Sequence, residues 1–297
     1  MNCLVTGGAG FIGSVLVDAL IDAGHYVRVV DNESAKENQN FYWNIKADNY
    51  KYDICDYDKI FSLFNNIDFV FHLAAQSRIQ PSIINPSHTI RVNCYGTENV
   101  LHAAKENSVK RVVFSSSSSV YGMKNKLPHN ESMSRDCLNP YAISKVSGED
   151  LCTMYNKLYK LNVVILRYFN VYGDRQPTKG NFAPIIGRFL KLKKENKKLT
   201  IVGDGFQKRD YTHVEDVVKA NILSMESKKV GSAEIINIGS GENYNIKELV
   251  HMFEASYEFL PTRKGEAYET LADISKAKEL LDWKPTIFLE DWLRERI

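Results

Sequence analysis

Tyr141 and Lys145 stand four residues apart, in the segment Tyr-Ala-Ile-Ser-Lys. On an α-helix this spacing is about one turn, so it places a phenol and an ammonium on the same face. Tyrosine, with an unperturbed pKa of about 10, is a poor base at neutral pH, but a nearby positive charge favours the phenolate and lowers that pKa. We therefore predict that Tyr141, tuned by Lys145, removes a proton from a substrate hydroxyl while hydride leaves the same carbon.

Five consecutive serines, Ser115 to Ser119, follow a predicted buried strand at 111–114 and precede Val120-Tyr121-Gly122. Open α/β sheets bind their ligands at the carboxyl ends of strands, where this run begins. A serine hydroxyl there can relay a proton or hold a substrate oxygen. By itself the Tyr-x-x-x-Lys pair matches many exposed amphipathic helices. The serine run upstream and the N-terminal pattern described next favour the catalytic interpretation.

The N-terminal stretch up to Asp31 has the pattern of a dinucleotide-binding unit. An apolar strand is predicted at 2–6, a helix from Phe11 ending at Gly24, and a second strand at 26–30. The turn between the first strand and the helix carries Gly7, Gly10 and Gly13. Strand, glycine turn, helix, strand and acid in this order are the context that the dinucleotide fingerprint requires. An ordinary tight turn is the alternative, and it is much less favoured.

The residue types of this stretch suit an anionic dinucleotide. Pyrophosphate binds backbone N–H groups at a helix N-terminus, and side chains on the turn would block its approach. Gly13, inside the helix, allows close packing of helix and strand. Asp31 lies 21 residues after Gly10 and would accept hydrogen bonds from the adenine-ribose hydroxyls. Because a carboxylate there repels a 2′-phosphate, the predicted cofactor is NAD rather than NADP.

Strands and helices alternate through the first half of the chain. Further strands are predicted at 50–54, 68–73 and 163–168, with helices at 86–107 and 141–159, which together indicate a doubly wound parallel sheet. After residue 169 the chain becomes rich in loops. We therefore expect an α/β Rossmann domain over 1–170, to which segments near 210–240 return, and a smaller C-terminal α+β substrate lobe over 171–297. Helices are predicted in this lobe at 185–195 and 246–257.

The composition is that of an ordinary globular protein. Hydrophobic residues make up 44% and charged residues 25%, and the net charge of +2 shows no electrostatic footprint for nucleic acid. No apolar run approaches membrane-spanning length, and a first strand at residue 2 leaves no room for a signal peptide. Five scattered cysteines without CxxC spacing indicate thiols in a reducing compartment and no metal site. We expect a cytoplasmic protein without nucleic-acid or membrane partners.

Taken together, the motifs resemble the extended short-chain dehydrogenase/reductase family, and within it the nucleotide-sugar epimerases and dehydratases. The resemblance covers nearly the whole chain. The motifs that carry it are Thr6-Gly7-Gly8-Ala9-Gly10-Phe11-Ile12-Gly13, Asp31-Asn32, Asp53-Ile54, His72-Leu73-Ala74-Ala75, Asn93 with Gly96-Thr97, Phe114-Ser115-Ser116-Ser117, Val120-Tyr121-Gly122, Tyr141-x-x-x-Lys145, Arg167-Tyr168-Phe169-Asn170-Val171-Tyr172-Gly173, Gly203-Asp204-Gly205, Arg209-Asp210 and Ala272-Asp273.

The resemblance implies roles for individual residues. Tyr141 would be the catalytic base, Lys145 would hold the nicotinamide ribose, and Ser117 would relay the proton and contact the substrate. The implied NAD contacts are Gly7, Gly10, Phe11, Ile12, Gly13, Asp31, Asn32, Asp53, Ile54, Leu73, Ala74, Ala75, Asn93, Ser115, Ser116, Tyr141, Lys145 and Tyr168. Asn170, Arg209 and Arg263 would bind the substrate, the arginines at its diphosphate. A surface ion pair is the alternative for each arginine, and it competes more closely for Arg263.

The residues before Val-Tyr-Gly favour one reaction. In 4,6-dehydratases of the family an Asp-Glu pair stands there, and in the decarboxylases a Glu occupies the second place. Here both places are serine, Ser118 and Ser119. Elimination needs a group that shuttles a proton, and a serine hydroxyl is a poor substitute for a carboxylic acid in that role. The sequence therefore resembles the UDP-glucose 4-epimerases, which epimerise C4 of a UDP-sugar through a 4-keto intermediate on NAD that is regenerated in each turnover.

Several points stay open in the sequence. Hexose-only epimerases carry a bulky aromatic two positions before Ala-Asp; here Thr270 stands there, so UDP-N-acetylhexosamines are candidates beside UDP-glucose and UDP-galactose. An NAD(P)H-dependent reductase, or another epimerase or dehydratase of a nucleotide-linked sugar, is the alternative enzyme. A non-catalytic nucleotide-binding regulator would have no need of the intact serine, tyrosine and lysine. The family implies a homodimer through the helices at 86–107 and 141–159.

Overall fold

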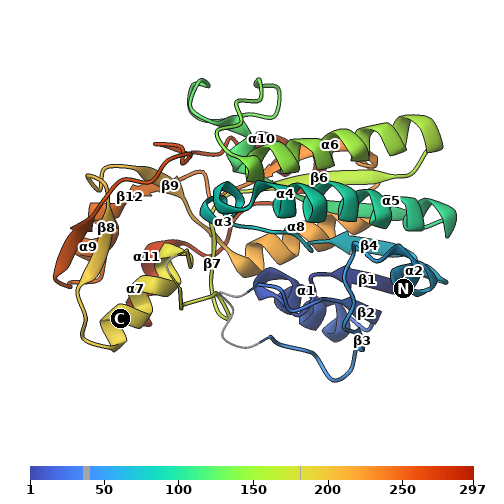
Figure 1. Ribbon diagram of the computed structural model, residues 1–297, viewed down its shortest axis with the longest axis horizontal. Coiled ribbons are helices and arrows are strands. Elements are labelled where there is room, and N and C mark those ends of the chain that lie inside the picture. The colour runs from blue at the N-terminus through green and yellow to red at the C-terminus, as the bar shows by residue number, and fades with distance from the viewer. Residues whose placement is uncertain (36–40, 181) are drawn as a thin grey trace.

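The computed structural model describes residues 1–35, 41–180 and 182–297. A seven-stranded parallel sheet with helices on both faces forms the larger part (Figure 1). Its strands, in spatial order, are β11 (Ser232–Ile238), β6 (Val163–Tyr168), β5 (Arg111–Ser117), β4 (Phe69–His72), β1 (Asn2–Thr6), β2 (Tyr26–Val30) and β3 (Asp48–Tyr50). The chain runs from β1 outward to β3 and then returns to place β4 on the other side of β1. At such a reversal the neighbouring strand ends open into a crevice for ligands.

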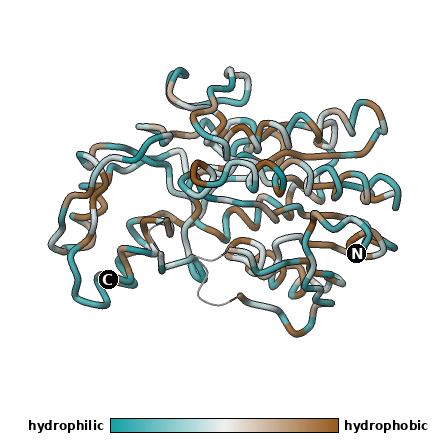
Figure 2. The backbone as a smooth tube through the Cα atoms, viewed as in Figure 1, coloured by the Kyte–Doolittle hydropathy of each residue, from teal (hydrophilic) through white to brown (hydrophobic). Residues whose placement is uncertain are grey.

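The two faces of the sheet bury different cores because successive side chains of a strand point to opposite faces. Val5, Phe71 and Val113 pack with α1 (Phe11–Asp22), α8 (Val214–Glu226) and α10 (Ser275–Leu281). Leu4, Val70 and Val112 pack on the other face, under α2 (Tyr57–Phe61), α5 (Gly96–Glu106) and α6 (Pro140–Tyr159). Figure 2 shows apolar backbone segments along the strands between these helix layers. Burial on both faces explains why the strands read as continuous apolar runs.

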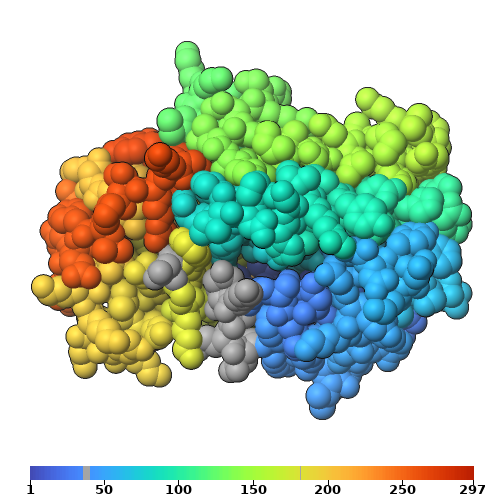
Figure 3. All heavy atoms as spheres, viewed as in Figure 1, coloured from blue at the N-terminus to red at the C-terminus, as the bar shows by residue number. Residues whose placement is uncertain are grey.

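The smaller lobe, which lies apart from the helix layers in Figure 1, has a core of its own. It holds α7 (Ile185–Lys194), α9 (Ile246–Met252), α11 (Leu289–Arg294) and three strand pairs. The pairs are β8 (Leu199–Val202) with β13 (Tyr257–Leu260), β9 (Lys208–Asp210) with β12 (Asn243–Asn245), and β7 (Val171–Tyr172) with β10 (Thr212–His213). Figure 3 shows the face on which the lobe meets the N-terminal half of the chain.

The fold prediction is confirmed, and two of its elements are corrected. The third strand covers 48–50 rather than 50–54, because the Asp53 carboxylate accepts a hydrogen bond from the Cys55 N–H and turns the chain there. The helix predicted at 246–257 ends at Met252, and residues 257–260 instead pair with β8. The strand β8 lies more than fifty residues away in the chain, so no local sequence pattern could predict this pairing.

Candidate active site

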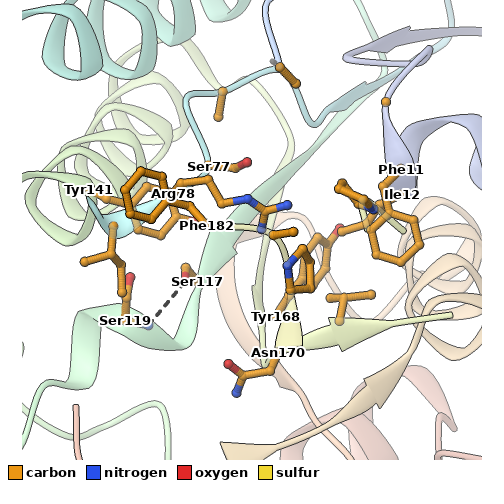
Figure 4. Close-up of a pocket in the computed structure, with 18 of the residues that line it drawn as sticks. Phe11, Ile12, Ser77, Arg78, Ser117, Ser119, Tyr141, Tyr168, Asn170 and Phe182 are labelled. Atoms are coloured by element: carbon orange, nitrogen blue, oxygen red, sulfur yellow. Dashed lines mark hydrogen bonds between the residues drawn. The ribbon is translucent and has the colours of Figure 1, made fainter. Parts of the chain in front are cut away.

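A cavity of about 500 Å³ lies at the carboxyl ends of the central strands and continues into the lobe. It collects nearly all the residues predicted for the site. Those that line it are Gly7, Gly10, Phe11, Ile12, Gly13, Asp31, Asn32, Ile54, Leu73, Ala74, Ala75, Ser115, Ser116, Ser117, Tyr141, Lys145, Tyr168, Asn170, Arg209 and Arg263. Figure 4 shows Phe11 and Ile12, at the start of α1, across the cavity from Tyr141 of α6. Asp53 and Asn93 are not part of the lining.

The glycine turn is packed too tightly for side chains. A Cβ on Gly7 would lie 2.7 Å from the Ala74 nitrogen, and one on Gly13 would lie 2.1 Å from the Gly7 carbonyl oxygen. Gly7 also has a φ of +74°, which L-residues rarely adopt. A Cβ on Gly10, at the start of α1, would meet only the Gly7 oxygen, at 3.3 Å. The turn thus leaves the N-terminus of α1 open to the cavity, and it fits the pyrophosphate of a dinucleotide.

Asp31 ends β2 with its carboxylate in the cavity lining. One oxygen accepts from the Ala9 N–H at 3.1 Å and the other from the Glu33 N–H at 2.8 Å, while burial raises the pKa of the carboxyl group. Asn32 also lines the cavity, and its side chain donates to Asp53 at 2.9 Å. Asp53 therefore orients Asn32 from outside the cavity lining, and its direct contact with the cofactor stays a prediction.

Asn93 likewise acts from behind the cavity. It lies in a π-helical turn, Arg91–Tyr95, between α4 (Pro86–Ile90) and α5. Its side chain accepts from the Gln76 N–H at 2.7 Å and donates to the Gln76 carbonyl at 3.0 Å and to the Ser144 hydroxyl at 2.8 Å. The amide thus fastens the segment after β4 to α6, so it positions residues of the lining rather than joining them.

Tyr141 enters the cavity from the first turn of α6. The helix begins there because the Asn139 side chain accepts from the Ala142 N–H at 2.8 Å and Pro140 occupies the first helical position. Ser117, at the end of β5, lies beside the Tyr141 phenol in the cavity lining and lowers the pKa of that phenol. Tyr141 and Ser117 therefore lie in the same cavity, as a proton transfer between them would require.

Lys145 lies one turn along the same face, with its ammonium 5.9 Å from the centroid of the Tyr141 ring. It donates to the Ser115 carbonyl oxygen at 2.7 Å, and burial lowers its pKa to about 8. Burial raises the pKa of Tyr141, and the two groups that oppose this are Ser117 and Arg78. The ammonium is directed to the backbone of β5, and the lowering of the Tyr141 pKa by Lys145 stays a prediction.

A buried ion pair fixes β5, the strand that ends in the serine run, against α6. Glu149, two turns after Tyr141 on α6, accepts from the Ser116 hydroxyl at 2.6 Å and from two nitrogens of Arg167 at 2.8 and 2.7 Å. Glu149 and Arg167 are almost fully buried, and this pair holds β5 and β6 against α6. The sequence analysis missed Glu149, although a carboxylate continuing the Tyr141–Lys145 face was a signal for it.

The lobe end of the cavity is cationic. Arg209 donates to the Tyr268 carbonyl at 3.0 Å, with its side chain 15% exposed, and Arg263 lies 5.7 Å from the centre of the Phe182 ring. Arg188, on α7, lines the same end and was not among the predicted site residues, because it lies in a helix that carries no motif. Its neighbour Arg263 lowers the pKa of Arg188, as does burial. Such a group of guanidinium side chains matches the geometry and charge of a diphosphate.

Asn170 and Thr270 lie where the strand ends meet the lobe. The Asn170 side chain donates to the Asp210 carbonyl at 2.9 Å and to the Thr270 hydroxyl at 3.4 Å, and this hydroxyl also accepts from the Asp210 N–H at 3.3 Å. Both residues line the cavity, and Thr270 is buried. Thr270, the position from which the size of the accepted sugar was predicted, therefore forms part of the cavity wall.

The structure was also searched for metal-binding groups of side chains and for membrane-spanning helices. Within the described ranges, no three or more histidine, cysteine, aspartate or glutamate side chains are grouped so as to hold a metal ion. No helix of those ranges combines the length and the apolar character needed to cross a bilayer.

A Rossmann sheet, a glycine turn and a Ser-Tyr-Lys group in one cavity define a dinucleotide-dependent enzyme of the short-chain dehydrogenase/reductase type. The sequence pattern of the NAD dependent epimerase/dehydratase family matches residues 3–239. The chain therefore belongs to that family, and its cofactor is NAD, as the sequence predicted. The glycine turn and the Asp31 carboxylate would hold the two ends of the adenosine diphosphate half.

Three related proteins show the range of the family. The chain is 36% identical to the UDP-glucuronate 4-epimerase of Thermodesulfobacterium geofontis, over 99% of this chain and 94% of that protein. The UDP-glucose 4-epimerase of Thermotoga maritima, solved with UDP-glucose, superposes with a TM-score of 0.94 at 36% identity, covering 100% of this chain and 97% of that one. A UDP-N-acetylglucosamine 4-epimerase of Methanobrevibacter ruminantium, in complex with UDP-N-acetylmuramic acid, gives 0.91 at 36% identity, covering 99% and 96%. All three act on nucleotide sugars.

Proposed function

We propose that the chain interconverts the C4 epimers of a UDP-sugar, using NAD that is restored in every turnover. The observation that carries the proposal is the single cavity in which Tyr141 and Ser117 lie between the glycine turn and the arginines of the lobe. A nucleotide sugar held by its diphosphate at the lobe end would present its sugar to Tyr141. The relatives named as 4-epimerases of UDP-sugars support the same reading.

Each residue then has a chemical task. NAD, when bound, supplies a hydride acceptor that also gives the hydride back. Tyr141 takes the proton of the 4-hydroxyl group and later returns it, and Ser117 holds the same oxygen. Lys145 is placed to bind the nicotinamide ribose. Arg188, Arg209 and Arg263 keep the diphosphate anchored while the 4-keto sugar turns to offer its other face, so that hydride return inverts C4.

Elimination and decarboxylation are less well supported by this cavity. Ser118 and Ser119 line it where an acid would be needed to shuttle a proton. The Ser119 hydroxyl is buried and, among the residues that the structure describes, has no hydrogen-bond partner. A hydroxyl group does not exchange protons with a carbon acid as a carboxyl group does, so we favour epimerisation over a net reductase, dehydratase or decarboxylase.

For the sugar, we propose that N-acetylhexosamines are accepted beside hexoses. The support is Thr270, whose small side chain forms part of the wall where a bulky ring would narrow the cavity. The relatives do not decide between sugars, since their names include glucose, glucuronate and N-acetylglucosamine.

We also propose a cytoplasmic homodimer. Apolar side chains are exposed along α3 (Ile79–Ile84), α4 and α6, among them Ile84 at 74% and Ile143 at 48%. A second copy packing on these helices would cover them. The five cysteines are all free thiols, which suits a reducing compartment.

The deciding experiment is proton NMR of the purified protein with UDP-galactose, UDP-GalNAc and UDP-glucuronate in separate tubes, with no NAD added. Appearance of a 4-epimer in any tube demonstrates a self-recycling epimerase, and the relative rates identify the sugar. No epimer in any tube, even after NAD is supplied, would refute the proposal. Stoichiometric consumption of added NAD(P)H would instead support the reductase.

Tyr141→Phe tests the assigned base in the same assay. Removing the phenol oxygen is expected to lower turnover by about 10²- to 10⁴-fold, the usual contribution of a general base. UDP binding, followed by calorimetry, should be retained because the lobe arginines are unchanged in this variant. Full activity in this variant would show that another group takes the proton.

A further inference from the structure

The chain after β13 forms a loop, residues 263–267, that leaves the lobe and lies along the cavity. It begins at Arg263, to which the proposed function assigns the diphosphate, and we call it the diphosphate loop. A Cβ on Gly265 would lie 3.3 Å from the Leu138 carbonyl oxygen and 3.4 Å from the Asn139 Cβ. The φ of +78° at this glycine suits the close approach. The diphosphate loop therefore packs directly on the residues that lead into α6.

Asn139 connects the diphosphate loop to α6 through a single side chain. Its oxygen accepts from the Ala142 N–H at 2.8 Å, which is the capping bond that starts the helix. Its NH2 group donates to the Gly265 carbonyl oxygen at 2.8 Å. The side chain is buried, since the residue is only 7% exposed. One amide thus fixes the loop at a point two residues before Tyr141.

The helix α3 makes a second connection to the diphosphate loop. Gln80 donates from its side chain to the Lys264 carbonyl at 3.0 Å and to the Glu266 carboxylate at 3.1 Å. The Ser82 hydroxyl, on the same helix, accepts from the Tyr141 N–H at 3.1 Å. The loop, α3 and the first turn of α6 therefore hold one another. Loss of the bond from α6 would leave the loop attached through Gln80.

We propose that Asn139 is a positioning residue, which sets the place of the diphosphate loop relative to Tyr141. This inference rests on the proposed function, in that Arg263 binds the diphosphate and Tyr141 is the base. A nucleotide sugar anchored at the loop reaches Tyr141 through its sugar, so the spacing of loop and α6 decides how closely the 4-hydroxyl group approaches the phenol oxygen. Reacting groups held about 1 Å out of place can lose about 100-fold in rate.

The test removes one bond of Asn139 and keeps the other. Asn139→Asp retains an oxygen that caps the helix but has no N–H to donate to Gly265. Asn139→Ser is an uncharged capping variant whose hydroxyl ends one bond short of the amide nitrogen. In both variants we expect kcat to fall by about 10- to 100-fold, with a change of less than about threefold in the Kd of UDP measured by calorimetry. Asn139→Ala loses both bonds and should also have the lowest melting temperature.

Asn156→Asp is the matched control on the same helix. The Asn156 side chain lies outside the cavity lining and donates to the Leu161 and Gly231 carbonyls at 2.9 and 3.1 Å. Loss of these two bonds should lower the melting temperature and leave kcat at the wild-type level. If kcat fell equally in the control, general loosening of α6 would explain the effect and the proposal would be overturned.

Hydrogen exchange measures the connection without turnover. With no sugar present, the backbone amides of residues 261–270 should exchange faster in Asn139→Asp and Asn139→Ser than in the wild type or in Asn156→Asp. Unchanged exchange in both Asn139 variants would overturn the proposal. An unchanged kcat, or a weaker binding of UDP that accounts for all the lost kcat/KM, would overturn it too. Faster exchange together with an inactive wild type would instead refute the proposed function and leave the connection between loop and helix standing.

Discussion

The two ends of the cavity are built in different ways. The cofactor end is built around one continuous stretch, in which β1, the glycine turn, α1 and β2 are followed by Asp31, and it is completed by Ile54, Leu73, Ala74 and Ala75. The lobe end takes Arg188 from α7, Arg209 from β9 and Arg263 from the chain after β13. The first end depends on backbone shape, since its glycines admit no side chains. The second depends on side-chain charge gathered from separate elements. This difference predicts that substitutions at the cofactor end reduce stability and NAD binding, whereas substitutions at the lobe end reduce binding of the nucleotide sugar.

The largest effect is expected from Gly13→Ala at the cofactor end. The new Cβ would lie 2.1 Å from the Gly7 carbonyl oxygen, so the turn or α1 must move. We expect a loss of about 3 kcal/mol in the free energy of unfolding, the upper part of the usual overpacking range, and a loss of NAD binding. Denaturant titration and the absorbance of released NAD measure both. Gly24→Asn is the control for NAD content, because a Cβ at Gly24 meets nothing within 4 Å; its φ of +80° is expected to cost some stability without any loss of NAD. Full NAD content in Gly13→Ala would contradict this account.

Arg209→Gln should damage only the lobe end. Loss of a charge-assisted contact to the diphosphate is expected to weaken UDP binding by about 10- to 100-fold. The NAD content should stay at the wild-type level, because the glycine turn is untouched. Calorimetry with UDP measures the first and released NAD the second, with Arg175→Gln as the control outside the cavity. Unchanged UDP affinity would mean that Arg209 is only a structural ion-pair partner of Glu266.

Lys145 lies between the two ends, and its burial should cost stability in the NAD-free protein. Its pKa is about 8 when folded, below the ordinary 10.5, so the folded state binds fewer protons between these values and stability should rise with pH there. Lys145→Met should therefore be more stable than the wild type at pH 7, by about 1–2 kcal/mol after the lost bond to Ser115 is counted.

Thermal melts at a series of pH values measure this prediction. The stability gain of Lys145→Met should shrink as the pH approaches the pKa of free lysine. The activity of this variant should be lost at every pH. Lys157→Met, at an exposed position of the same helix, should show no such trend. A lower melting temperature for Lys145→Met at neutral pH would show that the hydrogen bond to Ser115 outweighs the cost of burial.

The smallest effect is expected from Thr270→Tyr at the sugar wall. A ring there would narrow the cavity, and we expect the ratio of N-acetylhexosamine to hexose turnover to fall by about tenfold, within the discrimination that a hydrophobic wall provides. Competing UDP-GalNAc and UDP-galactose in one NMR tube gives the ratio directly. Thr270→Ser keeps the hydroxyl that accepts from the Asp210 N–H and should leave the ratio near that of the wild type. An unchanged ratio in Thr270→Tyr would remove Thr270 from the specificity account.

The sequence by itself determined the Rossmann sheet, the cofactor turn and the Ser117–Tyr141–Lys145 group. These features rest on short-range rules: glycines at a turn, apolar periodicity, and one helical turn between two side chains. The comparisons with known proteins confirm the family, and the structure brings these residues into one cavity.

Tertiary structure decided what the side chains meet. Asp53 and Asn93 carried the right motifs but lie behind the lining, because their hydrogen bonds are taken by Asn32 and Gln76. The ammonium of Lys145 turned to the Ser115 carbonyl, to which it donates at 2.7 Å. Partners of this kind are set by packing between elements distant in the chain, and local sequence patterns contain no record of that packing.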